Sequence, residues 1–199
     1  PDLPARYLYA VATHPDHRDR GLAAMLCQRL RDDCFARGEL LLTKPAEPSL
    51  YAWYAEKIGA VPTLPCRTLT VTEPAAGTVT RLSPEEYAAR REALLANAPH
   101  TRLPDTLFQW EHLLHTHYGG GFFATDRAIA DAFFDEQRAE IAELLSPAPE
   151  QDAGILLSHF RTPSVSVTCP GGTETYVSCA APDILPDALC SVWFGPVFG

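Results

Sequence analysis

The sequence lacks several features that would place it in whole classes of protein. No apolar run approaches the roughly 18 residues that a membrane-spanning helix needs, so we expect no membrane-spanning segment. The sequence also has no excess of basic over acidic residues. The formal net charge is −9, which argues against a nucleic-acid partner and is compatible with attraction of a cationic amine. With 46% hydrophobic and 21% charged residues, the composition is that of an ordinary soluble globular protein.

Paired cysteine motifs and export signals are absent as well. None of the six cysteines forms a C-x-x-C pair, and no signal-peptide pattern is present. We therefore expect reduced thiols and a cytoplasmic protein, with several cysteines filling core positions. The cysteines are Cys27, Cys34, Cys66, Cys169, Cys179 and Cys190.

Common motifs of hydrolases and nucleotide-binding proteins are missing too. The sequence contains no G-x-S-x-G, Walker or G-x-G-x-x-G run. The run Gly119-Gly120-Gly121 follows a predicted helix instead of opening one, so it predicts a turn. No short internal repeat is visible.

The stretch Tyr7–Ala24 is the most informative part of what is present. Tyr7–Thr13 is apolar at both positions of a two-residue alternation, which predicts a strand buried between two layers. A basic loop follows, with Arg18 and Arg20 before the start of a helix near Gly21. Unpaired amides at the first turn of a helix, aligned with its dipole, bind anions, and flanking arginines add full charge. The loop therefore predicts an anion site that suits a pyrophosphate.

The run Arg18-x-x-Gly21-x-Ala23 resembles motif A of the GNAT N-acetyltransferase superfamily, whose pattern is Gln/Arg-x-x-Gly-x-Gly/Ala after a strand and before a helix. Pro15 and a second arginine are also usual there. The resemblance implies an α/β (α+β) fold with a mixed central sheet flanked by helices, and acetyl-CoA as cosubstrate. The cofactor-binding residues that it implies are Val11, Ala12, Thr13, Arg18, Asp19, Arg20, Gly21, Leu22, Ala23 and Ala24.

Two helices and two strands are predicted after the loop. A strand at Leu40–Thr43 is expected to lie parallel to the first strand, and Thr68–Thr72 alternates strictly, which predicts another strand. An aromatic-rich helix should begin at Pro48 and end at Gly59. The helix of the basic loop should end at Gly38, and its apolar face would consist of Leu22, Met25, Leu26, Leu30 and Cys34.

The aromatic-rich helix supplies the candidate general acid. In the family, a tyrosine on this helix precedes a glycine by four residues, whereas Tyr54 precedes Gly59 by five. Tyr54 is the predicted catalytic residue, since a phenol stays protonated at neutral pH and can donate to a departing thiolate. Tyr51 and Trp53 remain rivals, and packing of any of these rings in the core is the alternative. Val11–Thr13 would offer backbone groups to pantetheine and the thioester carbonyl.

A Pro-Ala-Ala-Gly run near residue 76 predicts a boundary between two domains, 1–76 and 77–199. In the second domain we expect a strand, two helices, a three-stranded meander, a helix and further strands. This order resembles a second, degenerate GNAT-like domain in a tandem. The loop Ser146–Pro149 carries no R-x-x-G-x-A run, so we expect no cofactor there. The predicted strands, by residue, are Val79–Leu82, Phe122–Thr125, Ala128–Phe134, Ala139–Leu145, Val165–Thr168, Thr175–Cys179 and a final aromatic run from Val192 to Phe198, and the helices are Ser83–Ala96, Pro104–Tyr118 and Glu150–His159.

One histidine motif raises the question of a metal. His112, His115 and His117 form H-x-x-H-x-H near a helix end. Helical zinc pairs more often lie four residues apart, no carboxylate cluster is tied to the motif by sequence, and histidines near a helix C-terminus are favoured by the dipole. We therefore expect no metal site.

The sequence favours an N-acetyltransferase that transfers the acetyl group of acetyl-CoA to a small-molecule or peptide amine by direct attack in a ternary complex. Two alternatives stay open: a non-catalytic CoA-binding or scaffold protein, and a fragment that needs a partner chain to complete its sheet. The family places three strands and two helices before motif A, and only a few residues precede Tyr7 here. A homo-oligomer would fit the second alternative.

Overall fold

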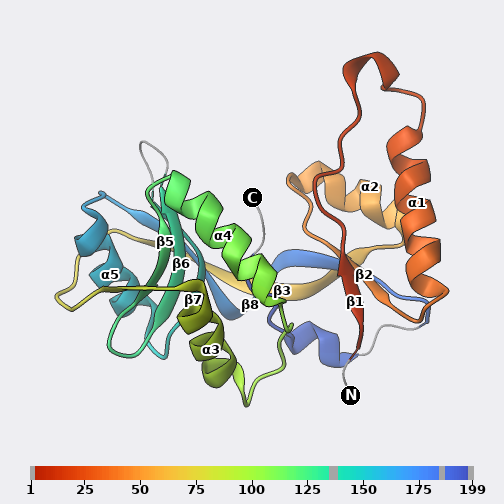
Figure 1. The fold of residues 1–199 in the computed structure, drawn as a ribbon. Helices are drawn as coiled ribbons and strands as arrows, with labels where there is room; N and C mark the ends of the chain where they lie inside the picture. The colour runs from red at the N-terminus through yellow and green to blue at the C-terminus, as the bar shows by residue number, and fades with distance from the viewer. Residues whose placement is uncertain (1–2, 135–138, 184–186, 197–199) are drawn as a thin grey trace. The chain divides into compact units, whose positions relative to one another are not determined.

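The computed structural model describes residues 3–134, 139–183 and 187–196, and divides the chain into two compact units. Unit 1 takes the described residues of Pro1–Pro65 and Thr175–Ser191, and unit 2 those of Cys66–Glu174 and 192–196. None of the described helices is long and apolar enough to cross a membrane. The chain is coloured by residue number in Figure 1.

Unit 1 is a small mixed sheet with two helices. The parallel pair β1 (Ala5–Tyr7) and β2 (Leu40–Thr43) is extended by the last residues of β8 (Val165–Ala180), which run antiparallel to β2. α1 (Leu22–Phe35) lies between β1 and β2 in the chain, and α2 (Pro48–Ile58) follows β2. Short 3₁₀ turns precede α1 at Pro15–His17 and follow β8 at Asp187–Ser191. β3 (Val61–Val71) pairs with β8, and both strands have residues in each unit.

Of the two helices of unit 1, α2 ends at Gly59 as the sequence predicts, whereas α1 ends at Phe35, three residues before the predicted Gly38. Gly38 and Gly59 adopt left-handed conformations with φ of 68° and 71° after α1 and α2, and the amide of Gly59 donates to the carbonyl of Ala55. The predicted apolar face of α1 is partly wrong. Met25 and Leu26 are 63% and 70% exposed. The core is instead contacted by Cys27, Leu30 and Cys34, which share one helical face at three- and four-residue steps.

The first predicted strand is also shorter and less buried than expected. Pairing with β2 ends near Leu8, whose amide donates to the carbonyl of Leu42 at 2.8 Å. Residues 9–12 are exposed and belong to no strand. Ala10 has a φ of 54°, which turns the chain away from an extended conformation. The prediction of a buried strand over Tyr7–Thr13 is therefore wrong: of that range only Tyr7 belongs to β1, and Tyr7 and Leu8 are half-buried.

Unit 2 is a sheet covered by helices on both faces. Its strands follow the order β8, β7 (Ala139–Leu145), β6 (Ile129–Phe134), β5 (Gly121–Ala124), β4 (Thr80–Leu82), and β7 runs parallel to β8 while the other pairs are antiparallel. This confirms the predicted meander and, with unit 1, the mixed α/β (α+β) class with helices around mixed sheets.

Neighbouring side chains on β5 point to opposite faces of that sheet and show which helix covers each face. Phe122 stacks on Tyr87 of α3 (Pro84–Leu95), beside α4 (Asp105–His117), while Phe123 packs against Phe160 of α5 (Pro149–Phe160). The helices form as predicted, and α3 begins with a complete capping box between Ser83 and Glu86.

Three boundaries differ from the sequence-based expectation. The compact units do not follow the predicted division into 1–76 and 77–199, because residues 66–76 belong to unit 2 and Thr175–Ser191 belong to unit 1. The two predicted strands after α5 form one long strand, β8. In the final aromatic run the described residues contain one isolated bridge, between Trp193 and His100, instead of a strand. Residues 135–138, between two predicted strands of the meander, and the part of the final aromatic run beyond residue 196 lie outside the described residues.

Candidate functional site

The site in unit 1 begins where its two parallel strands part. The hydroxyl of Thr43, at the end of β2, donates to the carbonyl of Leu8 at 3.2 Å. Beyond this point the segment of Val11–Thr13 leaves the ladder, so its backbone groups are not committed to strand pairing. The parting strands thus leave backbone donors and acceptors beside the start of α1.

The first turn of α1 presents amides to the same place. Gly21 occupies the N-cap position with a φ of 71°, and no side chain caps the helix. A Cβ at Gly21 would meet nothing within 4 Å, so the glycine is needed for its backbone conformation and not for space. Because the first helical bond runs from the amide of Met25 to the carbonyl of Gly21, the amides of Leu22–Ala24 lie at the positive end of the helix dipole.

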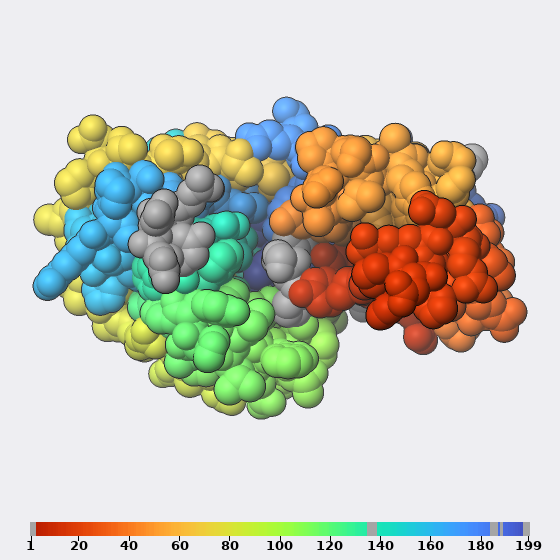
Figure 2. All heavy atoms as spheres, turned by 90° about the horizontal axis from the view of Figure 1, so that it is seen from above, coloured from red at the N-terminus to blue at the C-terminus, as the bar shows by residue number. Residues whose placement is uncertain are grey.

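Basic side chains surround this turn. The Arg18 Nε donates to the Thr13 carbonyl at 3.3 Å, which holds the guanidinium beside the end of the parted strand. Arg20 lies 3.0 Å from a ring nitrogen of His17. The loop lies on the surface of unit 1, as the red region of Figure 2 shows. Amides, dipole and guanidinium groups together form a site for an anion.

These groups line one pocket of about 580 Å³. Nine of the ten predicted cofactor-binding residues line it, and Arg20 does not. Three further residues of the lining were not assigned to cofactor binding: His17, Trp53 and Lys57. Trp53 and Lys57 are four residues apart on α2, so helical spacing was the signal that they share a face. The lining consists of Val11, Ala12, Thr13, His17, Arg18, Asp19, Gly21, Leu22, Ala23, Ala24, Trp53 and Lys57.

Tyr54, the predicted acid, lies behind this lining. Its side chain is only 7% exposed and packs edge-on against Trp53, with ring centroids 4.9 Å apart. Burial raises the pKa of the Tyr54 phenol, the nearby Cys27 adds to the rise, and a hydrogen bond with Thr43 opposes it. Through Thr43, the phenol is linked to the point where the strands part. The rival Tyr51 donates its hydroxyl to the carbonyl of Tyr176 at 3.1 Å.

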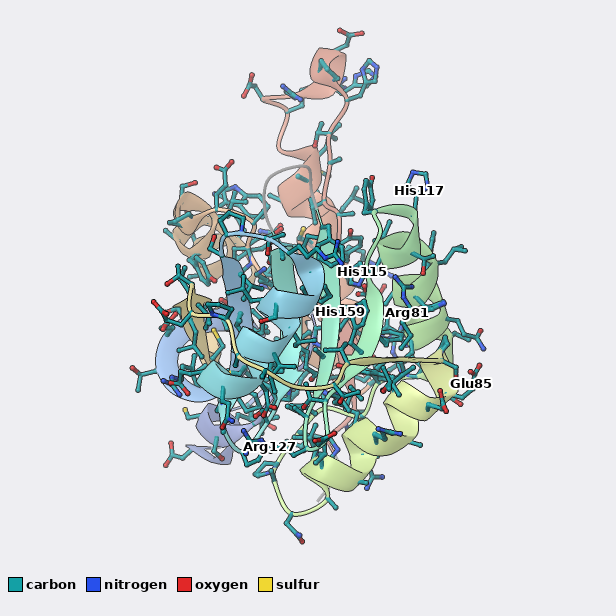
Figure 3. All side chains as sticks on the ribbon, turned by 90° about the vertical axis from the view of Figure 1, so that its left-hand side faces the viewer. Arg81, Glu85, His115, His117, Arg127 and His159 are labelled. Carbon is teal, nitrogen blue, oxygen red and sulfur yellow. The ribbon has the colours of Figure 1, made fainter. Side chains whose placement is uncertain are left out.

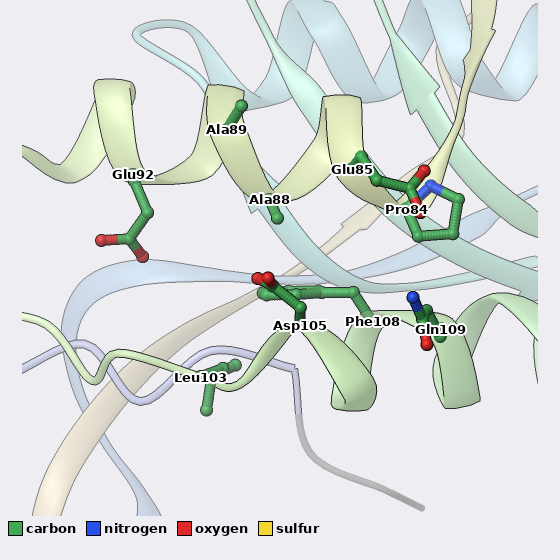
Figure 4. A pocket seen from close by; sticks show the side chains of 9 residues that line it. All are labelled: Pro84, Glu85, Ala88, Ala89, Glu92, Leu103, Asp105, Phe108 and Gln109. Atoms are coloured by element: carbon green, nitrogen blue, oxygen red, sulfur yellow. The ribbon is translucent and has the colours of Figure 1, made fainter.

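A second pocket, of about 280 Å³, lies between α3 and α4 in unit 2 (Figure 4). Its ionisable lining residues are all acidic: Glu85, Glu92 and Asp105. Glu85 and Asp105 belong to the first turns of their helices, where carboxylates are favoured by the dipole. The second pocket therefore offers no complement to a phosphate.

The start of α5, which occupies the position that motif A would take in unit 2, is also acidic. The buried carboxylate of Asp152 accepts hydrogen bonds from Ser146 at 2.5 Å and Thr125 at 2.9 Å. A carboxylate thus already lies beside this helix N-terminus.

The histidine motif of α4 is divided among different surroundings. His115 is buried and His117 is exposed at the end of the helix (Figure 3). His112 is half-buried and its Nδ1 has no hydrogen-bond partner among the described residues. His115 lies with Glu111 and Asp131, and sequence reasoning missed both carboxylates. Two features of the sequence could have indicated them. Glu111 precedes His115 by four residues on a predicted helix, and Asp131 is the one charged residue of an otherwise apolar predicted strand.

Comparison with known proteins finds one family model that is similar to part of the chain. The model of the acetyltransferase (GNAT) family matches residues 2–60, which contain the whole pocket lining. No curated protein matches the chain significantly.

Solved structures resemble both units of the chain. A probable N-acyltransferase of unknown function from Enterococcus faecalis has a TM-score of 0.62 at 13% identity, over 90% of this chain and 55% of its own. A GCN5-related N-acetyltransferase from Anabaena variabilis gives 0.61 at 11% identity (91% and 56%), and Eis1 from Mycobacterium abscessus gives 0.56 at 14% (91% and 57%). The chain thus spans just over half of the length of these proteins, and at these identities the likeness is one of fold.

Proposed function

We propose, because the model of the GNAT acetyltransferase family matches residues 2–60, that the chain is an acyltransferase that binds acetyl-CoA in the pocket of unit 1. The acceptor in this proposal is an amine, carried by a small molecule or a peptide. The observation that carries the proposal is the uncapped, glycine-led start of α1 beside Arg18. That arrangement suits the pyrophosphate of CoA.

The proposed reaction is a direct attack of the amine on the thioester. It requires orientation of the two reactants, stabilisation of charge on the carbonyl oxygen and a proton for the departing thiolate. The backbone groups of Val11–Thr13 would orient pantetheine and the carbonyl. Tyr54 would provide the proton, because its raised pKa keeps the phenol protonated.

A second candidate function is CoA binding without turnover. It is favoured by the position of Tyr54, which does not line the pocket and is packed in the core of unit 1. In that case the phenol would only support the fold. Turnover with a panel of amines distinguishes the two functions, since both require CoA to bind.

The CoA site is tested by reversing two charges. Arg18→Glu with Arg20→Glu should weaken CoA binding by well over tenfold, because each reversal replaces attraction of the pyrophosphate with repulsion. Isothermal titration calorimetry with CoA measures the affinity.

The matched control is Arg29→Glu with Arg31→Glu. This control changes the net charge of the protein by the same amount, at two residues of α1 that do not line the pocket. We expect nearly unchanged affinity in the control. Equal affinities of the two variants and the wild type would refute the pocket assignment.

A further inference from the structure

A cluster of ionisable side chains is buried in unit 2, apart from the acyl-CoA pocket. Glu111 and His115 lie one turn apart on α4, and Asp131 lies on β6. Their exposed fractions are 2%, 7% and 0%. Full burial of two carboxylates and an imidazole is costly unless their charges are compensated, so this cluster requires an explanation.

The imidazole of His115 lies between the two carboxylates. Its Nδ1 is 2.6 Å from Asp131 Oδ1, and its Nε2 is 3.1 Å from Glu111 Oε2. The ring also stacks on Phe133, with centroids 5.0 Å apart, which fixes its plane. Potential ligand atoms of the three residues all lie within 4.8 Å of one another.

One buried oxygen of the cluster is left over. Asp131 Oδ2 has no hydrogen-bond partner among the described residues, although its residue is fully buried. The strand is irregular there, since the register of β6 against β7 shifts between Asp131 and Ala132. Such bulges re-aim side chains, and this one accompanies a carboxylate that the protein itself does not satisfy.

The formal charges around the cluster do not balance. The buried carboxylates of Glu111, Asp131 and Glu143 interact with one another, and the buried cation beside them is Arg91, which binds Glu143 at 3.0 Å. With a neutral imidazole the set carries a formal charge of −2. Two protons or one divalent cation would neutralise it.

We propose that Glu111, His115 and Asp131 form a binding site for a divalent transition-metal ion, with Zn²⁺ as the best match. One imidazole nitrogen with two carboxylates is a ligand set that zinc accepts at about 2.0–2.2 Å, whereas Mg²⁺ prefers oxygen ligands and retains water. The bound ion would tie α4 to β6 and satisfy the spare oxygen of Asp131. Binding requires the ligand atoms to close to the roughly 3.4 Å separation of a tetrahedral site.

The protonation of the cluster agrees with a missing positive charge. Burial raises the pKa of Glu111 to about 8, with the charge of Asp131 adding to the rise. Burial also raises the pKa of Asp131, against the opposing effect of His115. Burial lowers the pKa of His115, but its contacts with Asp131 and Glu111 outweigh this effect, so its pKa is raised as well. Since zinc binds deprotonated ligands, its binding at this site would release protons.

The test uses full-length protein stripped with a chelator and then titrated with Zn²⁺. At about a hundredfold excess over Kd, we expect Tm to rise by roughly 5–10 °C. Glu111→Gln with Asp131→Asn should weaken zinc affinity more than about 100-fold, because each change removes a charged ligand but keeps the shape of the side chain. His117→Gln, which changes an exposed histidine of the same helix, should leave both quantities unchanged.

Co²⁺ gives a readout that does not depend on the variants. Bound in the cluster of the wild type, it should show the visible absorption of a tetrahedral N/O site, which Zn²⁺ abolishes. The proposal is overturned if the wild type shows neither a zinc-dependent Tm shift nor this spectrum. A shift of equal size in the Glu111/Asp131 variant would overturn it as well, because it would place zinc on surface histidines. Neither outcome bears on CoA binding in unit 1.

Discussion

At the scale of single residues, the three aromatic rings of α2 have different surroundings. Trp53 lines the pocket, Tyr54 is buried behind it, and Tyr51 donates to a backbone carbonyl. A phenol that donates a proton to a thiolate has to come within about 3 Å of the sulfur. Of the two tyrosines, Tyr54 is linked through Thr43 to the place where the strands part.

Removal of one hydroxyl tests Tyr54 as the acid. Tyr54→Phe should reduce kcat by roughly 10²–10⁴ and leave CoA affinity nearly intact, because the phenol acts on the thiolate and not on the pyrophosphate. In the pH profile of kcat, the fall at high pH reflects loss of the phenolic proton. Since burial raises the pKa of Tyr54, this fall should lie above pH 10, the ordinary value for tyrosine.

Tyr51→Phe is the matched control. Its hydroxyl bonds the carbonyl of Tyr176, so we expect a modest loss of stability and normal turnover. Full turnover in Tyr54→Phe with loss in Tyr51→Phe would reverse the assignment. Loss of folding in Tyr54→Phe would favour the core-packing alternative.

At the scale of elements, the helices were predictable because their ends carry explicit signals. Ser83 and Glu86 form the expected capping box, Gly59 ends α2, and Gly38 lies in the turn that follows α1. The strand before the basic loop was predicted too long, since apolar composition does not reveal where a partner strand diverges. The spacing of apolar residues also predicted wrongly that Met25 is buried. Apolar residues can lie on the exposed face of a helix, so spacing alone does not show which of them pack in the core.

The glycines at the ends of α1 permit a prediction about backbone strain. Gly21→Ala and Gly38→Ala should each reduce the free energy of unfolding by about 1 kcal/mol, because both positions have φ near 70° and open space around a new Cβ. Gly172→Ala should cost more. Its φ is 79°, and a Cβ there would lie 2.6 Å from the carbonyl oxygen of Cys66.

Urea unfolding of the three variants measures these differences. A neutral Gly21→Ala would show that the left-handed conformation at the start of α1 is not required. A loss at Gly172 no greater than at Gly38 would mean that the neighbouring strand relaxes.

At the scale of the whole molecule, the sequence could predict the order of the elements but not their division into units. The run near residue 76 has the composition of a linker, yet Thr175–Ala180 of β8 belong to unit 1, where Ser178–Ala180 pair with β2. Nothing local in residues 175–180 identifies their partner, because pairing over such a distance depends on the rest of the fold. The buried cluster of α4 and β6 escaped prediction for the same reason, since its carboxylates are 20 residues apart in sequence.

The division predicts that residues 1–76 do not fold alone. Without Thr175–Ala180, one edge of β2 has no partner strand. The core of unit 1 also loses Ala180, which belongs to the same cluster as Leu41. We expect a fragment of residues 1–76 to show no cooperative thermal transition by circular dichroism, whereas the full chain does. A sharp transition in the fragment would contradict this.

The pairing of β2 with β8 also sets an order of events during synthesis. Leu42 faces Cys179, so 137 residues separate the two partners in sequence. At about 5–20 residues per second, the ribosome needs roughly 7–27 s to translate that interval. During that interval β2 has an open hydrogen-bonding edge, although every residue that lines the pocket of unit 1 has already been made. β2 is thus made well before the strand that covers its open edge, and molecular chaperones have access to that edge for the whole interval.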